Sequence, residues 1–198
     1  MKNLSLVLLL FANVCYGQTL TYDQTQDIKV ASNYSNGDTL SIYTLKDGSE
    51  IKLGSELKFG SPLNTNRLFS RLYFGEYSLG KALLLGAPQQ LGDVYTGEKV
   101  IVTSIKVYHT KLTKNSALQI MLFVQNPTAP ALARNRTIAD LEMAIETKEV
   151  INPNAAMTRE QAIIKLKEAK DLVDLGMMSQ VEFDELKGKL TPIILKKE

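Results

Sequence analysis

Short apolar runs separated by turn residues occupy residues 38–152 and predict a β-rich domain. Residues 39–45 alternate between apolar and polar side chains and lead into Asp47-Gly48, a dipeptide typical of tight hairpin turns. Two longer runs, 99–112 and 117–125, place apolar side chains on both faces, which predicts a hairpin at the centre of a sheet. Glycines after the shorter runs favour bends and therefore a small antiparallel sheet or a barrel. Further strand candidates are residues 51–54, 57–60, 69–77 and 81–85.

A short helix is predicted near residues 137–147, between the last strand candidate and the C-terminal part of the chain. Thr137 is the expected N-cap, because Asp140 follows at the reciprocal position three residues later. The apolar positions that then share one helical face are Ile138, Leu141, Ala144 and Ile145. We expect this helix to cover one end of the sheet.

The pattern changes after Asn152-Pro153-Asn154 and predicts a helical hairpin over residues 157–192. Apolar positions recur at helical spacing from Ala162 to Val173, and Gly176 fits the left-handed position that commonly ends a helix. Capping boxes at Thr158–Gln161 and Ser179–Glu182 predict where the two helices begin. Pro192 is expected to stop the second helix.

A two-helix hairpin of this size cannot bury its own apolar stripe well, so it is expected to pack on something else. The expected partner is a second copy of the chain or another protein. The residues predicted for this apolar face and its caps are Thr158, Ile163, Leu166, Leu172, Val173, Gly176, Met178, Ser179, Phe183, Leu186 and Leu190.

The first seventeen residues predict a secretory signal peptide. Lys2 precedes an apolar core, residues 4–11, that is too short for a membrane span of about 20 residues. Small side chains at Cys15 and Gly17 favour cleavage after Gly17. The alternative is a lipoprotein acylated at Cys15, although Val14 stands where a small residue is expected. Either alternative predicts export, to the periplasm or cell envelope of a bacterium.

Residues 18–37 are polar and turn-prone and predict a linker or an edge segment. Taken together, the segments predict an α+β protein. Its parts are a small antiparallel β-sheet or barrel domain with a short helix, and then a C-terminal two-helix hairpin.

Composition narrows the chemistry that this chain can perform. Its 198 residues carry a net charge of +2 and include one Cys and one His. A Cys/His zinc cluster is therefore excluded, and there is no strong nucleic-acid signal. If Cys15 leaves with the signal peptide, the mature chain has no thiol. We expect no metal and no cofactor.

Candidate catalytic residues are few. His109 has no Ser or Cys partner at motif spacing, which favours a structural or surface histidine. Glu142, Glu146 and Glu149 alternate with other polar residues and are interpreted as solvated helix surface. The basic stretch of Lys106, His109, Lys111 and Lys114 beside Tyr108 is interpreted as a charged hairpin. A hydrolase would need two carboxylates that converge in one pocket, so the expectation is a protein that is not an enzyme.

Residues 162–190 carry Leu175-Gly176-Met177-Met178, then Ser179, Glu182-Phe183 and Lys187-Gly188-Lys189-Leu190. In this order the segment resembles the SHOCT (short C-terminal) domain, found at the ends of many bacterial proteins. Met177 and Met178 replace the usual Ile or Leu, and Gly188 weakens the second helix by about 1 kcal/mol relative to Ala. The resemblance implies oligomerisation or membrane-proximal interaction and supplies no catalytic residues.

Residues 47–60, 105–108 and 140–146 are similar to stretches of exported Bacteroidetes proteins that have no assigned activity. This second resemblance implies architecture and location only. The expected function is that of an exported, non-enzymatic envelope protein with a β-rich interaction domain and a hairpin for oligomerisation or interaction. The alternative is a ligand-binding module with a small molecule, a cell-wall glycan or nucleic acid in a β-barrel groove.

Overall fold

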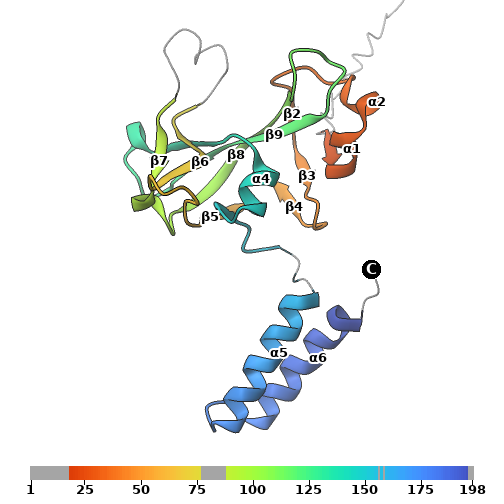
Figure 1. The fold of residues 1–198 in the computed structure, drawn as a ribbon, viewed down its shortest axis with the longest axis vertical. Helices are drawn as coiled ribbons and strands as arrows, with labels where there is room; N and C mark the ends of the chain where they lie inside the picture. The colour runs from red at the N-terminus through yellow and green to blue at the C-terminus, as the bar shows by residue number, and fades with distance from the viewer. Residues whose placement is uncertain (1–17, 77–87, 156, 158, 196–198) are drawn as a thin grey trace, which may run out of the picture. The chain divides into compact units, whose positions relative to one another are not determined.

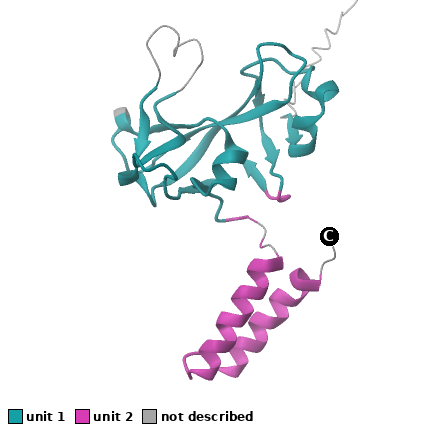
Figure 2. Ribbon diagram, viewed as in Figure 1, with its two compact units in different colours: residues 1–46, 50–153 teal, residues 47–49, 154–198 magenta. Residues whose placement is uncertain are grey.

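The computed structural model describes residues 18–76 and 88–195, except residues 156 and 158. The chain forms two compact units, residues 1–46 with 50–153, and residues 47–49 with 154–198 (Figure 2). The predicted signal peptide with Cys15, the strand predicted over residues 81–85 and the predicted cap Thr158 lie outside the described residues. Each unit is described by itself below.

The first unit is built on an antiparallel sheet whose two longest strands are β8 (Lys99–His109) and β9 (Leu118–Gln125) (Figure 1). The strand order is β11-β5-β8-β9-β10-β6-β7, and β2 also pairs with β8. The predicted hairpin is therefore confirmed, and it lies at the centre of the sheet. The other strands are β2 (Thr39–Leu40), β5 (Glu56–Phe59), β6 (Leu68–Phe74), β7 (Gln90–Gly92), β10 (Asn135–Ile138) and β11 (Val150–Ile151).

Burial along the two central strands follows the apolar pattern of the sequence. In β8 the alternation is interrupted once, at a register shift between Val102 and Ser104, and the buried positions continue at Ile105 and Val107. In β9 five consecutive residues from Ile120 to Val124 are buried. A strand with neighbours on both sides and buried side chains on both faces requires such a continuous apolar run.

The sheet is curled but open in the part of the chain that the structure describes. Its path ends at β11 and at β7, and these two strands do not pair with each other. The sequence leaves open whether the strands form a sheet or a barrel, and the described strands form a curled sheet. Two single 3₁₀ turns occur in its connections, η1 (Asp93–Tyr95) and η2 (Ala131–Ala133).

A second, three-stranded sheet consists of β1 (Thr19–Thr21), β3 (Ile42–Thr44) and β4 (Glu50–Lys52). The β3–β4 hairpin turns at Asp47-Gly48, as the sequence predicts, and the Asp47 carboxylate accepts from the Ser49 backbone N–H at 2.8 Å. β1 pairs in parallel with β3 at the edge of this sheet. Residues 18–37 thus contain an edge strand followed by two short helices, α1 (Tyr22–Gln26) and α2 (Ile28–Ala31).

The helix expected near residues 137–147 is α4 (Leu141–Glu146), and its predicted cap is wrong. Asp140 is the N-cap, since its carboxylate accepts from the Met143 backbone N–H at 3.3 Å. Thr137 is instead buried in β10, and its hydroxyl donates to the Gly75 carbonyl at 2.7 Å. Pairing of β10 with β9 and β6 on its two sides keeps Thr137 extended. The helix therefore begins one turn later than predicted.

The second unit is a hairpin of α5 (Arg159–Asp174) and α6 (Gln180–Leu195). Gly176 adopts the left-handed conformation, with φ of 71°, and the Met177 and Met178 N–H groups donate to the Leu172 carbonyl. The Ser179–Glu182 capping box is confirmed by reciprocal hydrogen bonds of 2.9 and 3.3 Å. Hydrogen bonds from Ser179 lower the pKa of Glu182, which keeps this capping carboxylate ionised.

The prediction that Pro192 stops the second helix is wrong, because α6 continues to Leu195. A proline removes one backbone hydrogen bond, and near the end of a helix this loss is limited to the last turn. The Thr191 hydroxyl donates to the Lys187 carbonyl at 2.7 Å, and the Arg159 side chain donates to the Ile194 carbonyl at 3.0 Å. The Ile194 carbonyl is one that the end of the helix leaves without a backbone partner, and the Arg159 bond satisfies it.

Glu149 is fully buried, so its interpretation as solvated helix surface is wrong. Its two carboxylate oxygens accept from the backbone N–H groups of Ser70, at 2.7 Å, and Arg71, at 3.1 Å. Its carbonyl accepts from the Gly60 N–H at 2.9 Å. Glu149 therefore connects β6, the end of β5 and the start of β11. The chain at residue 60 passes so close to residue 148 that a side chain at Gly60 would collide with the Lys148 carbonyl.

We predict that Gly60→Ala lowers the free energy of unfolding of the β-rich unit by about 2–4 kcal/mol, because the collision is with backbone. Gly92→Ala is the matched control, since its new methyl group would meet neighbouring atoms only at 3.9 Å or more. Denaturant titration of both variants measures the difference. Equal stabilities of the two variants would contradict the close approach.

Candidate functional site

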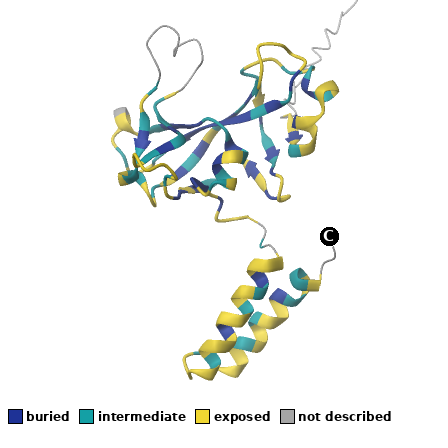
Figure 3. Cartoon of the chain, in the orientation of Figure 1, coloured by how far each residue is buried: buried dark blue, intermediate teal, exposed yellow. Residues whose placement is uncertain are grey.

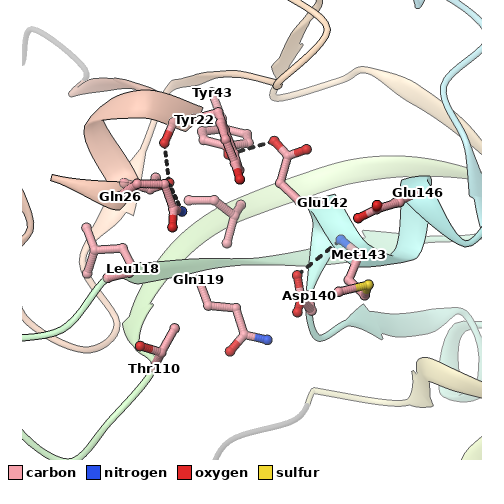
Figure 4. Close-up of a pocket in the computed structure, with 13 residues that line it drawn as sticks. Tyr22, Gln26, Tyr43, Thr110, Leu118, Gln119, Asp140, Glu142, Met143 and Glu146 are labelled. Carbon is pink, nitrogen blue, oxygen red and sulfur yellow. Dashed lines mark hydrogen bonds between the residues drawn. The ribbon is translucent and has the colours of Figure 1, made fainter.

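A pocket of about 250 Å³ lies in the first unit, between α1, β3, α4 and the turn end of the β8–β9 hairpin (Figure 4). Both helices contact β9, which supplies part of the pocket wall. The side chains come from parts of the chain that are distant in sequence, and only the fold brings them together. The lining residues are Tyr22, Thr25, Gln26, Tyr43, Thr110, Ala117, Leu118, Gln119, Ile120, Asp140, Glu142, Met143 and Glu146.

The polar groups of this pocket are mainly hydrogen-bond acceptors. Three of its lining residues are carboxylates, Asp140, Glu142 and Glu146, and none of its described lining residues is Lys, Arg or His. The residues with hydroxyl or amide side chains that complete the polar lining are Tyr22, Thr25, Gln26, Tyr43, Thr110 and Gln119. Such a pocket attracts positive charge and disfavours phosphate groups. Among the ligand classes considered from the sequence, nucleic acid therefore fits least well.

One pocket carboxylate is held by a buried tyrosine. The Tyr43 hydroxyl donates to a Glu142 carboxylate oxygen at 2.7 Å, and the Lys46 backbone N–H donates to the same oxygen at 3.2 Å. Burial raises the pKa of Tyr43, and so do the hydrogen bond and negative charge of Glu142. Tyr43 therefore remains a protonated donor, and it fixes the position of Glu142 in the pocket.

A hydrolase would need two carboxylates that converge in one pocket, and three carboxylates line this pocket. Two of these three carboxylates have structural roles. Asp140 caps α4, and Glu142 accepts the Tyr43 hydrogen bond. Glu146 is exposed at the last residue of the helix. The arrangement is better suited to holding a donor-rich ligand than to exchanging protons with one.

His109 connects three segments of the first unit. Its ring nitrogens lie 3.0 Å from the Tyr34 carbonyl and 3.3 Å from the Ser116 carbonyl, and its backbone N–H donates to Asn36. In the basic stretch around it, the Lys106 ammonium lies over the Phe123 ring and Lys114 donates to Ser35. These contacts give the stretch a role in packing the N-terminal segment against the β8–β9 hairpin.

A second polar cluster surrounds Arg136, which is buried in β10. Its guanidinium lies 5.1 Å from the centroids of both the Phe74 and Tyr95 rings, and its Nε lies 3.4 Å from a Glu98 oxygen. The same side chain donates to the Asn135 carbonyl at 3.0 Å. The sequence did not indicate this cluster, because its members come from β6, η1, β10 and a connecting turn. Its position in the interior gives it a structural role.

In the second unit, most residues of the hairpin are exposed and fewer are buried or half-buried (Figure 3). Ala162, Ala169 and Leu190 are buried, and they mark the stripe along which α5 and α6 pack. Exposed residues of the predicted set are Leu172, Gly176 and Ser179. The remaining described members of that set are half-buried: Ile163, Leu166, Val173, Met178, Phe183 and Leu186.

Other apolar side chains of the hairpin are exposed, and the sequence analysis missed most of them. Leu175, Met177 and Val181 are 72%, 76% and 69% exposed, and they flank the Gly176 turn. We call these three residues the apolar tip. Ile164 and Leu195 are also exposed, nearer the other end of the hairpin. The signal that could have found them is helical spacing, since Ile164 in α5 and Leu175, the residue directly after α5, are eleven residues, or three helical turns, apart.

Comparisons with known proteins give no relative for this chain: no protein-family model, no curated protein and no solved structure matches it. The SHOCT resemblance therefore stays a prediction. Among the described residues, no helix has both the length and the apolar character needed to cross a membrane.

We predict that Tyr43→Phe destabilises the β-rich unit by about 1–2 kcal/mol, because Glu142 loses its buried donor. The folded state raises the pKa of Tyr43 above its ordinary value of 10.0, so its contribution is present below about pH 10 and is lost as pH rises further. The stability of the wild type should therefore fall more steeply above pH 10 than that of Tyr43→Phe. Tyr108→Phe is the control, since burial alone raises the pKa of Tyr108.

Denaturant titrations at neutral pH and above pH 10 measure both effects. A loss of stability in Tyr43→Phe no larger than in Tyr108→Phe would contradict the proposed role of the bond to Glu142.

Proposed function

We propose that the protein is an exported, non-enzymatic interaction protein in which the C-terminal hairpin joins copies of the chain and the β-rich unit binds a ligand or partner. The observation that carries the proposal is the apolar tip, where Leu175, Met177 and Val181 are largely exposed. Exposed apolar side chains that lie together are typical of contact surfaces. Export, to the periplasm or cell envelope, is supported by the N-terminal sequence, with cleavage after Gly17 or acylation at Cys15 as the alternatives.

The hairpin has limited means of burying these side chains itself. Its interhelical stripe includes two alanines, Ala162 and Ala169, which let the helices approach closely but bury little apolar area. The larger apolar residues at the tip are left on the outside. Association with a second copy would remove them from water, at roughly 25 cal/mol for each Å² of apolar surface.

We predict that residues 18–198 form a dimer or larger oligomer, and that the triple substitution Leu175→Ser, Met177→Ser, Val181→Ser weakens association by about a hundredfold. All three positions are exposed, so the hairpin itself should remain folded. The control is Val94→Ser with Leu112→Ser, two exposed apolar positions of the β-rich unit. Light scattering measures the mass of each form.

A wild-type mass of one chain at all concentrations would contradict self-association. An oligomer that is equally stable in the triple variant would show that the apolar tip is not its contact.

A second candidate function is favoured by the pocket. The β-rich unit is proposed to bind a small ligand that carries a positive charge and several hydroxyl donors, because the pocket presents three carboxylates and no basic side chain among its described lining. A volume of about 250 Å³ accommodates a ligand about the size of one sugar ring. This proposal is independent of the hairpin.

We predict that glucosamine at about pH 6, where its amine is protonated, binds and raises the melting temperature, whereas uncharged N-acetylglucosamine does not. Glu146→Gln should weaken glucosamine binding about fivefold, because Glu146 is exposed and has no described structural partner. Glu50→Gln, at an exposed position of β4 outside the pocket, is the matched control. Equal binding of the two sugars, or no binding of either, would contradict the proposal.

A further inference from the structure

Positive and negative side chains are separated along the hairpin. Residues 171–186, which include the end of α5 and the start of α6, contain five carboxylates and no Lys or Arg: Asp171, Asp174, Glu182, Asp184 and Glu185. We call this end the acidic tip. The other end, the basic base, consists of residues 159–170 and 187–195. It carries Arg159, Lys165, Lys167, Lys170, Lys187 and Lys189, with only Glu160 and Glu168 of opposite charge.

These opposite charges do not neutralise each other within the hairpin. No ion pair joins any two of its described residues, although Lys167–Asp171, Lys170–Asp174 and Glu185–Lys189 have the spacing of helical ion pairs. In the two pairs of α5 the lysine precedes the acid, which is the less favourable orientation. Arg159, Glu182 and Asp184 accept or donate hydrogen bonds within the hairpin, and the other acidic and basic side chains are available to a partner.

The two aspartates of the tip also oppose the dipole of their own helix. Asp171 and Asp174 lie in the last turn of α5, where the partial charge of the helix end is negative and no basic residue is present. Carboxylates at this place destabilise an isolated helix. A positive surface placed against the tip would offset that cost.

We infer that two hairpins pair antiparallel, so that the acidic tip of each copy lies against the basic base of the other. This inference rests on the proposed self-association and specifies its geometry. A surface with opposite charges at its two ends is complementary to itself when one copy is inverted, as it is by a two-fold axis perpendicular to the hairpin. Parallel pairing would instead place tip against tip and base against base, with like charges opposed.

Antiparallel pairing also brings exposed apolar side chains of the two copies together. Ile164 lies on the half of α5 that belongs to the basic base, and Leu175 directly follows α5 at the acidic tip, eleven residues or about three helical turns further on. When one copy is inverted, Ile164 of each hairpin approaches Leu175 of the other. Charge and apolar pattern thus favour the same orientation.

Two charge variants of α5 distinguish antiparallel from parallel pairing. Asp171→Lys with Asp174→Lys removes negative charge from the acidic tip, and Glu160→Lys with Glu168→Lys adds the same positive charge to the basic base. Antiparallel pairing predicts that the tip variant raises the dimer dissociation constant about tenfold or more and that the base variant lowers it. Through the helix dipole alone, the tip variant should stabilise α5, because its lysines lie at the negative end of the helix, and the base variant should destabilise α5. A loss of folding therefore cannot produce the predicted change in the dissociation constants.

Sedimentation equilibrium of residues 18–198 and the two variants at low salt gives the dissociation constants. A tip variant that dimerises more tightly than the base variant would overturn antiparallel pairing while leaving self-association intact. Equal constants for the three proteins would likewise overturn it. A wild type with the mass of one chain at every concentration would overturn both this inference and the proposed self-association.

Discussion

The pairing of β8 with β9 is the interaction on which the rest of the β-rich unit depends. β5 and β2 add to β8, and β10, followed by β6 and β7, adds beyond β9. The same two strands carry the longest apolar runs of the sheet, and α1 and α4 both contact β9. The pocket follows from this arrangement, because its walls are the two short helices and its base includes residues 117–120 at the start of β9.

Features with a local cause could be predicted from the sequence. The central hairpin, the Asp47-Gly48 turn, the Gly176 helix end and the Ser179–Glu182 capping box each depend on a few neighbouring residues. Where the prediction failed, a distant segment decided the outcome. Thr137 is held in a strand by β6 and β9, and Glu149 is buried because Ser70 and Arg71, far away in sequence, donate to it. Pro192 differs, because it lies so near the end of α6 that the loss of its backbone hydrogen bond affects only the last turn.

In the candidate sites, too, features with a local cause could be predicted from the sequence and features that depend on distant segments could not. The pocket could not be predicted, because Tyr22, Tyr43 and Glu142 are brought together only by the fold. The hairpin could be predicted as an element, but most described residues of the stripe expected to bind a partner are half-buried. The side chains left for a partner are those that the helical pattern places outside this stripe, such as Leu175 and Val181. Charge separation along the hairpin, by contrast, is visible in the sequence once the antiparallel course of the two helices is known.

The mass of residues 18–198 as a function of salt tests the proposed self-association and its charge pairing most directly. Between about 0.05 and 0.5 M NaCl the Debye length falls from about 14 to about 4 Å, which screens charges exposed at a contact. Antiparallel hairpins paired through opposite charges predict a dimer at low salt that dissociates more readily as salt increases. A chain that is monomeric at low salt, or a dimer that becomes tighter with added salt, would contradict the proposal.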